Sequence, residues 1–150
     1  MLGRLAAEAA KSIAITSVLV LLALPFGISI ASGPLGFLLL ITLTASWAVV
    51  FAGFIQLIAL KTRSAAATNS GGLVFFPLLF LTPNFVPRHL LTRPMEIAAT
   101  FNPVTYIMEA LRSLILEDFA WAALARGFAV IAVLGAVMVA LNVRTIRNYD

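Results

Sequence analysis

Long apolar runs, separated by short polar or basic segments, dominate this chain. Each run is roughly 20 residues or somewhat longer, the length that an α-helix needs to cross about 30 Å of hydrocarbon at about 1.5 Å per residue. The pattern predicts spans at residues 12–31, 34–60, 65–82 and 122–143. We therefore expect an all-α fold, a polytopic membrane helix bundle that forms a single transmembrane domain over residues 1–150.

The third span is the weakest of the four, because Pro77 interrupts its short apolar part and a polar, glycine-rich stretch precedes it. Basic residues, which gather on the cytoplasmic side of membrane proteins, favour this crossing. One basic pair precedes it and another follows the last span, so an even number of crossings separates them: Lys61 and Arg63, then Arg144 and Arg147. The predicted topology has both termini in the cytoplasm and residues 83–121 outside.

Composition agrees with a membrane protein and excludes several kinds of function. The chain is 62% hydrophobic with a mean hydropathy of +1.07, and it contains no cysteine, which excludes disulfides and thiol chemistry. Its basic residues stand singly at the edges of apolar runs, a pattern of helix-end anchors and not of nucleic-acid binding. No phosphate-binding loop, catalytic triad or metal-ligand cluster is present, and the single histidine, His89, has no partner for a metal site. We predict a non-catalytic chain without a cofactor of its own.

Residues 83–121 are too polar for a span and too apolar for a free loop, and residues 92–117 within this segment carry the signals of two short helices. Thr92 is a predicted N-cap with Pro94 in the first turn, and Asn102-Pro103 ends this short helix and begins a second one. These features predict a re-entrant or interfacial helical hairpin. The second helix is expected to be apolar on the face made by Val104, Ile107, Met108, Leu111 and Ile115.

Two pairs of polar or aromatic residues have more than one interpretation. Glu109 and Arg112, three residues apart, can pair on the second hairpin helix, where they either orient and solubilise it or take part in gating. Trp47 and Gln56 lie within the second span and either line a translocation path or serve helix packing.

The motifs "PLLFLTPNFVP" and "FNPVTYIMEALRSLIL" resemble the C-terminal half of the permease subunits of ABC-2 type exporters, especially daunorubicin-resistance-like drug exporters. The residues that match in order are Phe85, Pro87, Asn102, Pro103, Thr105, Glu109 and Arg112. The chain departs from the family pattern at Thr82-Pro83-Asn84, where smaller residues are usual. By this resemblance the first two of six spans are expected to be missing.

The resemblance implies a plasma-membrane permease subunit that works with ABC ATPase subunits, which bind the ATP, and with a second copy or a paralogue. It further implies a hydrophobic or amphipathic cargo, drug-like or lipid-like, and an outer hairpin that closes the exit of the path. The alternative is a non-transporting membrane scaffold or an inactive truncated permease. An ion-coupled carrier would need charged residues buried in its spans, and only Arg126, near a span end, comes close to that.

Overall fold

A computed structural model of the chain describes residues 2–27, 30–82, 90–116 and 119–147, and the described part is helical without strands. Its α-helices are α1 (Leu2–Ala23), α2 (Gly33–Thr62), α3 (Ala65–Gly71), α4 (Phe75–Phe80), α5 (Arg93–Phe101), α6 (Pro103–Leu116) and α7 (Trp121–Arg147). Two 3-10 turns, Leu24–Phe26 and Gly72–Val74, follow α1 and join α3 to α4. The all-α membrane bundle expected from the sequence is confirmed.

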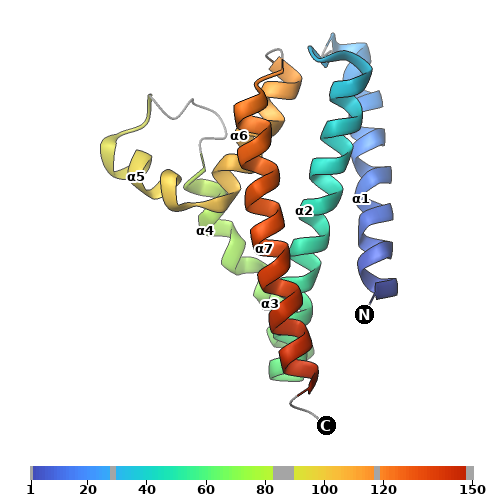
Figure 1. The fold of residues 1–150 in the computed structure, drawn as a ribbon, viewed down its shortest axis with the longest axis vertical. Coiled ribbons are helices and arrows are strands. Elements are labelled where there is room, and N and C mark those ends of the chain that lie inside the picture. Colours follow the sequence, from blue (N-terminus) through green and yellow to red (C-terminus); the bar gives the residue numbers. More distant parts are fainter. Residues whose placement is uncertain (1, 28–29, 83–89, 117–118, 148–150) are drawn as a thin grey trace.

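Three long helices form the body of the bundle, and the shorter ones lie along one side (Figure 1). The segments long and apolar enough to cross a membrane are Gly3–Phe26, Gly33–Thr62 and Trp121–Arg147. α2 lies in the middle, between α1 and α7, and α6 packs along α7. The chain ends marked in Figure 1 lie at the same end of the bundle, whereas α6 occupies the opposite end.

The first span begins and ends earlier than predicted, because α1 starts at Leu2 and stops at Ala23. Pro25 lies at the start of a 3-10 turn that follows α1, and Gly27 ends this turn in the left-handed conformation at φ 78°. Proline lacks the N–H that would continue the helix, and glycine adopts positive φ without strain. Residues 2–11, which precede the predicted span, thus form the first turns of α1. Lys11 and Glu8 form an ion pair there, with 2.7 Å between the Lys11 Nζ and a Glu8 carboxylate oxygen.

The predicted third span is a broken helix, from Ala65 to Phe80, that is shorter than 18 residues. The chain enters it through a tight reversal in which Arg63 takes the left-handed conformation at φ 50° and Ser64 caps α3. At about 1.5 Å per residue the segment is about 24 Å long, a little less than the hydrocarbon core. That residues 65–82 cross the membrane stays a prediction.

An aromatic cluster holds α4 against α2. The ring of Phe75 meets three α2 rings edge-on, with centroid distances of 4.8 Å to Phe51, 5.1 Å to Phe54 and 6.0 Å to Trp47. Edge-to-face geometry places the positive ring edge on the negative ring face, which adds to the burial energy of such pairs. The broken third segment therefore packs on α2 through specific contacts.

The core lies where α2, α6 and α7 meet. Its buried apolar residues are Leu40, Leu43, Val50, Ile107, Ala110, Leu114, Leu124 and Ile131. Large apolar side chains elsewhere are exposed, for example Leu19 and Leu22 on α1 and Val133 on α7. Because a bilayer is as apolar as these side chains, such exposure is what a lipid-facing surface requires.

Close backbone approach adds to the apolar packing between α6 and α7. A Cβ added to Gly127 would lie 2.8 Å from the Ala110 Cβ and 3.2 Å from the Tyr106 carbonyl oxygen. Further along α7, the fully buried Asn142 donates to the Gly53 carbonyl at 3.0 Å and to the Met138 carbonyl at 2.8 Å. Small residues and interhelical hydrogen bonds are the usual means by which helices associate inside a bilayer.

Replacing Gly127 with Ala should destabilise the bundle by about 1–3 kcal/mol, because the added methyl group meets a Cβ and a backbone oxygen that cannot both move away. The measurement is thermal unfolding in detergent, followed by circular dichroism.

Gly72→Ala is the matched control, since its added Cβ meets nothing within 4 Å and its backbone is right-handed helical. That variant should leave stability unchanged or raise it by about 0.4–1 kcal/mol through the lower entropy of the unfolded chain. Equal effects of the two substitutions would contradict the close α6–α7 contact.

Candidate functional site

The joint between α5 and α6 is formed by Asn102 and Pro103, as the sequence predicts. Asn102 ends α5, and its Oδ1 accepts a hydrogen bond from the Val104 N–H at 3.0 Å. Pro103 occupies the first position of α6, where a missing N–H costs nothing. Thr92 is the N-cap residue of α5, although its side chain makes no capping bond.

The same asparagine connects the hairpin to α4. Its Nδ2 donates to the Leu78 carbonyl oxygen at 2.6 Å and to the Thr82 Oγ1 at 2.9 Å, while the Thr82 hydroxyl donates to that same carbonyl at 2.7 Å. Asn102 is 3% exposed and Thr82 6%. The Leu78 carbonyl belongs to the last turn of α4, whose acceptors have no intrahelical donor. The joint thus satisfies the open end of a helix distant in sequence.

The other end of α6 is tied to the turn between α1 and α2. The Leu114 carbonyl accepts from the Ser32 Oγ at 3.0 Å and from the Ser32 N–H at 3.4 Å, and the Ile115 carbonyl accepts from the Ala31 N–H at 3.3 Å. These are again terminal carbonyls without a helical donor. α6 is therefore held by polar contacts at both ends, and we call it the brace helix.

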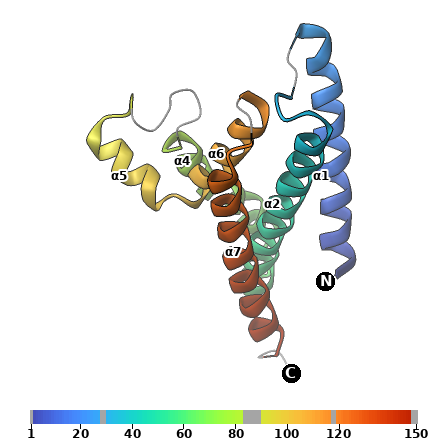
Figure 2. The same cartoon turned by 45° about the horizontal axis from the view of Figure 1, so that its top comes forward.

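α5 projects away from the bundle (Figure 2). Ala99 is the one buried residue that this helix contributes, and Phe101 at its end is 84% exposed. The Tyr106 hydroxyl on α6 donates to the Thr100 carbonyl at 2.8 Å, and this bond links α6 to the last turn of α5. The two helices predicted within residues 92–117 correspond to α5 and α6, up to Leu116, and their re-entrant or interfacial placement in the membrane stays a prediction.

The buried face of the brace helix differs in part from the predicted apolar face. Val104 and Ile107 are buried as predicted, but Met108, Leu111 and Ile115 are only half-buried. The buried positions include Thr105, Ala110, Ser113 and Leu114 in their place. The buried face of α6 contains small residues because α7 approaches it closely at Gly127. A row of large side chains on this face would prevent that approach.

Thr105 is fully buried, and its Oγ1 has no hydrogen-bond partner among the described residues. It lies one turn after Asn102, on the same end of the brace helix. A buried hydroxyl without a partner costs about 1–3 kcal/mol. The joint between α5 and α6 therefore contains two buried polar side chains three residues apart: Asn102, which has hydrogen-bond partners, and Thr105, which has none among the described residues.

The other predicted site residues are placed as follows. Glu109 and Arg112 lie half-buried, three residues apart on α6, and the ion pair between them stays a prediction. Phe85 and Pro87 lie outside the described residues. Trp47 is half-buried and packs on Phe75.

Gln56, the other predicted path-lining residue, is half-buried on α2, and its Oε1 is an enclosed acceptor without a described partner. The path-lining roles of Trp47 and Gln56 stay predictions. In the described part of the chain no group of His, Asp and Glu side chains could hold a metal ion.

Two residues of the site were not predicted from the sequence, Ser32 and Thr82. Ser32 stands in a short uncharged turn and Thr82 just after an apolar run, places where a hydroxyl is common and carries no pattern. Their partners are 82 and 20 residues away in the chain, so only the folded arrangement reveals them.

Replacing Asn102 with Ala should destabilise the bundle by about 1–3 kcal/mol, because the Val104 N–H and the end of α4 lose their buried partner. Thr82→Val should cost less, since the Leu78 carbonyl keeps its bond from Asn102. Thermal unfolding of both variants and of the double variant gives the coupling energy.

We expect a coupling of about 0.5–3 kcal/mol for this contacting pair. The reference is Thr100→Val, whose hydroxyl is exposed and bonds only within α5, and which should be near neutral. Additive effects of the Asn102 and Thr82 substitutions would show that the two side chains do not act together.

A comparison with protein families assigns this chain to one of them. A model of the ABC-2 type transporter family matches residues 1–116, which include α1 to α6 and every residue of the Asn102 joint and the brace helix. No curated protein and no solved structure matches the chain. Since the match covers well over half of the sequence, the chain belongs to the ABC-2 type transporter family and is a membrane-embedded permease component of an ABC transporter.

Proposed function

We propose that this chain is the permease subunit of an ATP-driven exporter for a hydrophobic or amphipathic compound, drug-like or lipid-like. It works with a second copy or a paralogue and with ABC ATPase subunits, which bind and hydrolyse ATP. The hairpin of α5 and α6 closes the exit of the path. Family membership supports the permease role, and the brace helix supports the gating role.

The observation that carries the gating role is the attachment of α6 at both ends. At one end Asn102 bonds to α4, and at the other end the Leu114 and Ile115 carbonyls bond to the turn before α2. A shift of α4 relative to α2 must therefore either move α6 or break one of these attachments. The hairpin thus has the connections that a gate coupled to the spans requires.

The strength of these attachments suits a switch. A net hydrogen bond contributes about 0.5–1.5 kcal/mol, so either attachment is worth a few kcal/mol at most. Two packings that differ by a few kcal/mol are both accessible, and a partner that contacts them differently can shift the population between them. Nucleotide binding to the ATPase subunits supplies that differential contact in this proposal.

The distribution of basic residues supports the proposed orientation. Six of them are on the N-terminal part of α1 and around the C-terminal ends of α2 and α7, which lie at one end of the bundle: Arg4, Lys11, Lys61, Arg63, Arg144 and Arg147. By the positive-inside rule this end is cytoplasmic, and the hairpin then lies on the outer side of the plasma membrane.

This topology predicts that exposed positions at the two ends of the bundle are labelled from opposite sides of the membrane. The chain has no cysteine, so each single-cysteine variant is labelled at the introduced position alone. Thr62→Cys and Ile146→Cys should react with a membrane-impermeant maleimide only after the membrane is opened. Leu90→Cys should react in intact cells, because an odd number of crossings separates it from Thr62. Labelling of Thr62→Cys and Leu90→Cys from the same side would show that Ala65–Phe80 does not cross.

Glu109→Ala or Arg112→Ala, made in the complete transporter with its ATPase partner, should reduce efflux of a fluorescent lipophilic dye at least several-fold. The physical reason is that half-buried charges on the brace helix stabilise one packing of the hairpin over the other. Efflux is measured from preloaded cells, and membrane insertion is checked by the amount of protein in the membrane fraction.

The control is Glu96→Ala, an exposed carboxylate in the first turn of the projecting α5, which should leave efflux unchanged. Normal efflux in the Glu109 and Arg112 variants would show that the pair only orients α6. Absence of nucleotide-dependent efflux for the unsubstituted protein, with any of a panel of lipophilic dyes, would favour a non-transporting assembly role.

A further inference from the structure

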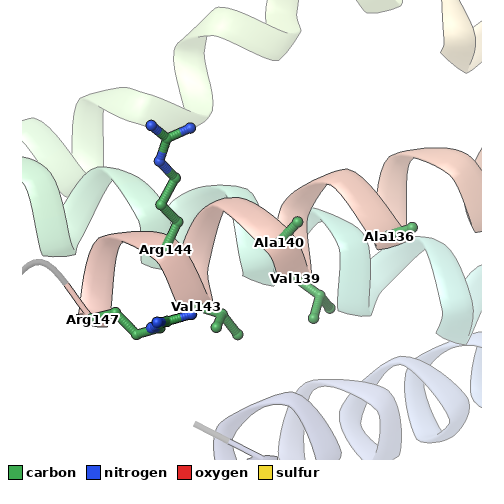
Figure 3. Close-up of a pocket in the computed structure, with 6 residues that line it drawn as sticks. All are labelled: Ala136, Val139, Ala140, Val143, Arg144 and Arg147. Atoms are coloured by element: carbon green, nitrogen blue, oxygen red, sulfur yellow. The ribbon is translucent and has the colours of Figure 1, made fainter.

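The C-terminal half of α7 carries an open groove with a volume of about 870 Å³ (Figure 3). The described residues that line it belong to α7 and are exposed: Ala136, Val139, Ala140, Val143, Arg144 and Arg147. Their spacing of three and four residues places them on one face of the helix. The two alanine side chains are small and leave space in the groove, and the part of the groove between Ala136 and Val143 is lined by apolar side chains.

Two arginines stand at the end of this groove. Arg144 and Arg147 lie in the last turn of α7 and project to different sides of the helix (Figure 3). Neither guanidinium forms an ion pair with a residue that the structure describes, and α7 contains no carboxylate side chain. The surface therefore combines an apolar trough with two cationic groups at one end.

We propose that this groove binds an anionic phospholipid, with its headgroup at the end of the groove that Arg144 and Arg147 flank and one acyl chain along Ala140 and Ala136. Guanidinium groups bind phosphate oxygens through paired, charge-assisted hydrogen bonds. α7 has 27 residues, or about 40 Å of helix, so its last turn reaches beyond a hydrocarbon core of about 30 Å into the headgroup layer. This inference requires α7 to cross the bilayer and does not depend on export.

A second copy of the chain fits this face less well. A twofold axis along the membrane normal would pair the groove with itself and bring the arginines of both copies to the same depth. No carboxylate on α7 is available to neutralise them, and juxtaposed like charges oppose association. A lipid headgroup supplies the negative charge that the face lacks.

The test uses a tryptophan reporter in lipid vesicles. Val137→Trp places the reporter on the exposed surface of α7, beside the groove but not in its lining, in a background where Trp47 and Trp121 are replaced by Phe. Quenching by dibrominated phosphatidylglycerol, compared with dibrominated phosphatidylcholine, gives the relative affinity. Because both arginines attract the negative headgroup, the preference for phosphatidylglycerol over phosphatidylcholine should be up to about thirtyfold.

Arg144→Gln with Arg147→Gln should abolish the preference, whereas Arg126→Gln, an exposed arginine at the other end of the same helix, should retain it. Ala140→Leu keeps both charges but fills the floor of the groove, so it should lower the quenching by both lipids, and this readout remains if the double glutamine variant fails to insert. Equal quenching by the two lipids in the unsubstituted groove would overturn the proposal. Protection from both lipids, together with cross-linking of two copies through α7, would assign the groove to a second chain.

Discussion

The hydrocarbon interior offers no water to an unpaired backbone group, and the arrangement of the short helices follows from this constraint. A single long helix satisfies its own carbonyls, but a chain broken into α4, α5 and α6 exposes a set of terminal carbonyls at every break. Asn102 and Thr82 satisfy those at the end of α4, and Ser32 and Ala31 satisfy those at the end of α6. The breaks are tolerated because other parts of the chain supply the donors.

The same contacts join elements that are far apart in sequence, which is the basis for assigning a gating role to the hairpin. In a soluble domain such bonds would compete with water and could be lost cheaply. Because Asn102, Thr82 and Ser32 are buried here, loss of these bonds leaves polar groups unpaired, so the hairpin and the spans have few ways to move independently. The close contact of Gly127 with Ala110 adds a steric restraint along the length of α6. Thr105, buried and without a described partner, is the one weak point in this end of the brace helix.

The outer surface of the bundle follows different rules from its interior. Apolar side chains exposed on α1, α4 and α7 suit contact with lipid tails, and such contact contributes little to helix association. One lipid-facing region therefore differs from another in its charge and its shape. The C-terminal end of α7 combines two arginines with an apolar groove. The brace helix and this groove lie toward opposite ends of α7, so one helix connects the proposed gate to the proposed lipid site.

Much of the architecture was available from the sequence, because spans and helix starts depend on local patterns. Hydrophobic run length predicted α2 and α7, and Asn102-Pro103 predicted the break between α5 and α6. The end of α1 at Ala23, the buried face of α6 and the roles of Ser32 and Thr82 were decided only by tertiary structure. Each of these depends on which distant backbone comes close, and apolar periodicity carries no such information when every side of a helix can face lipid, a neighbouring helix or both.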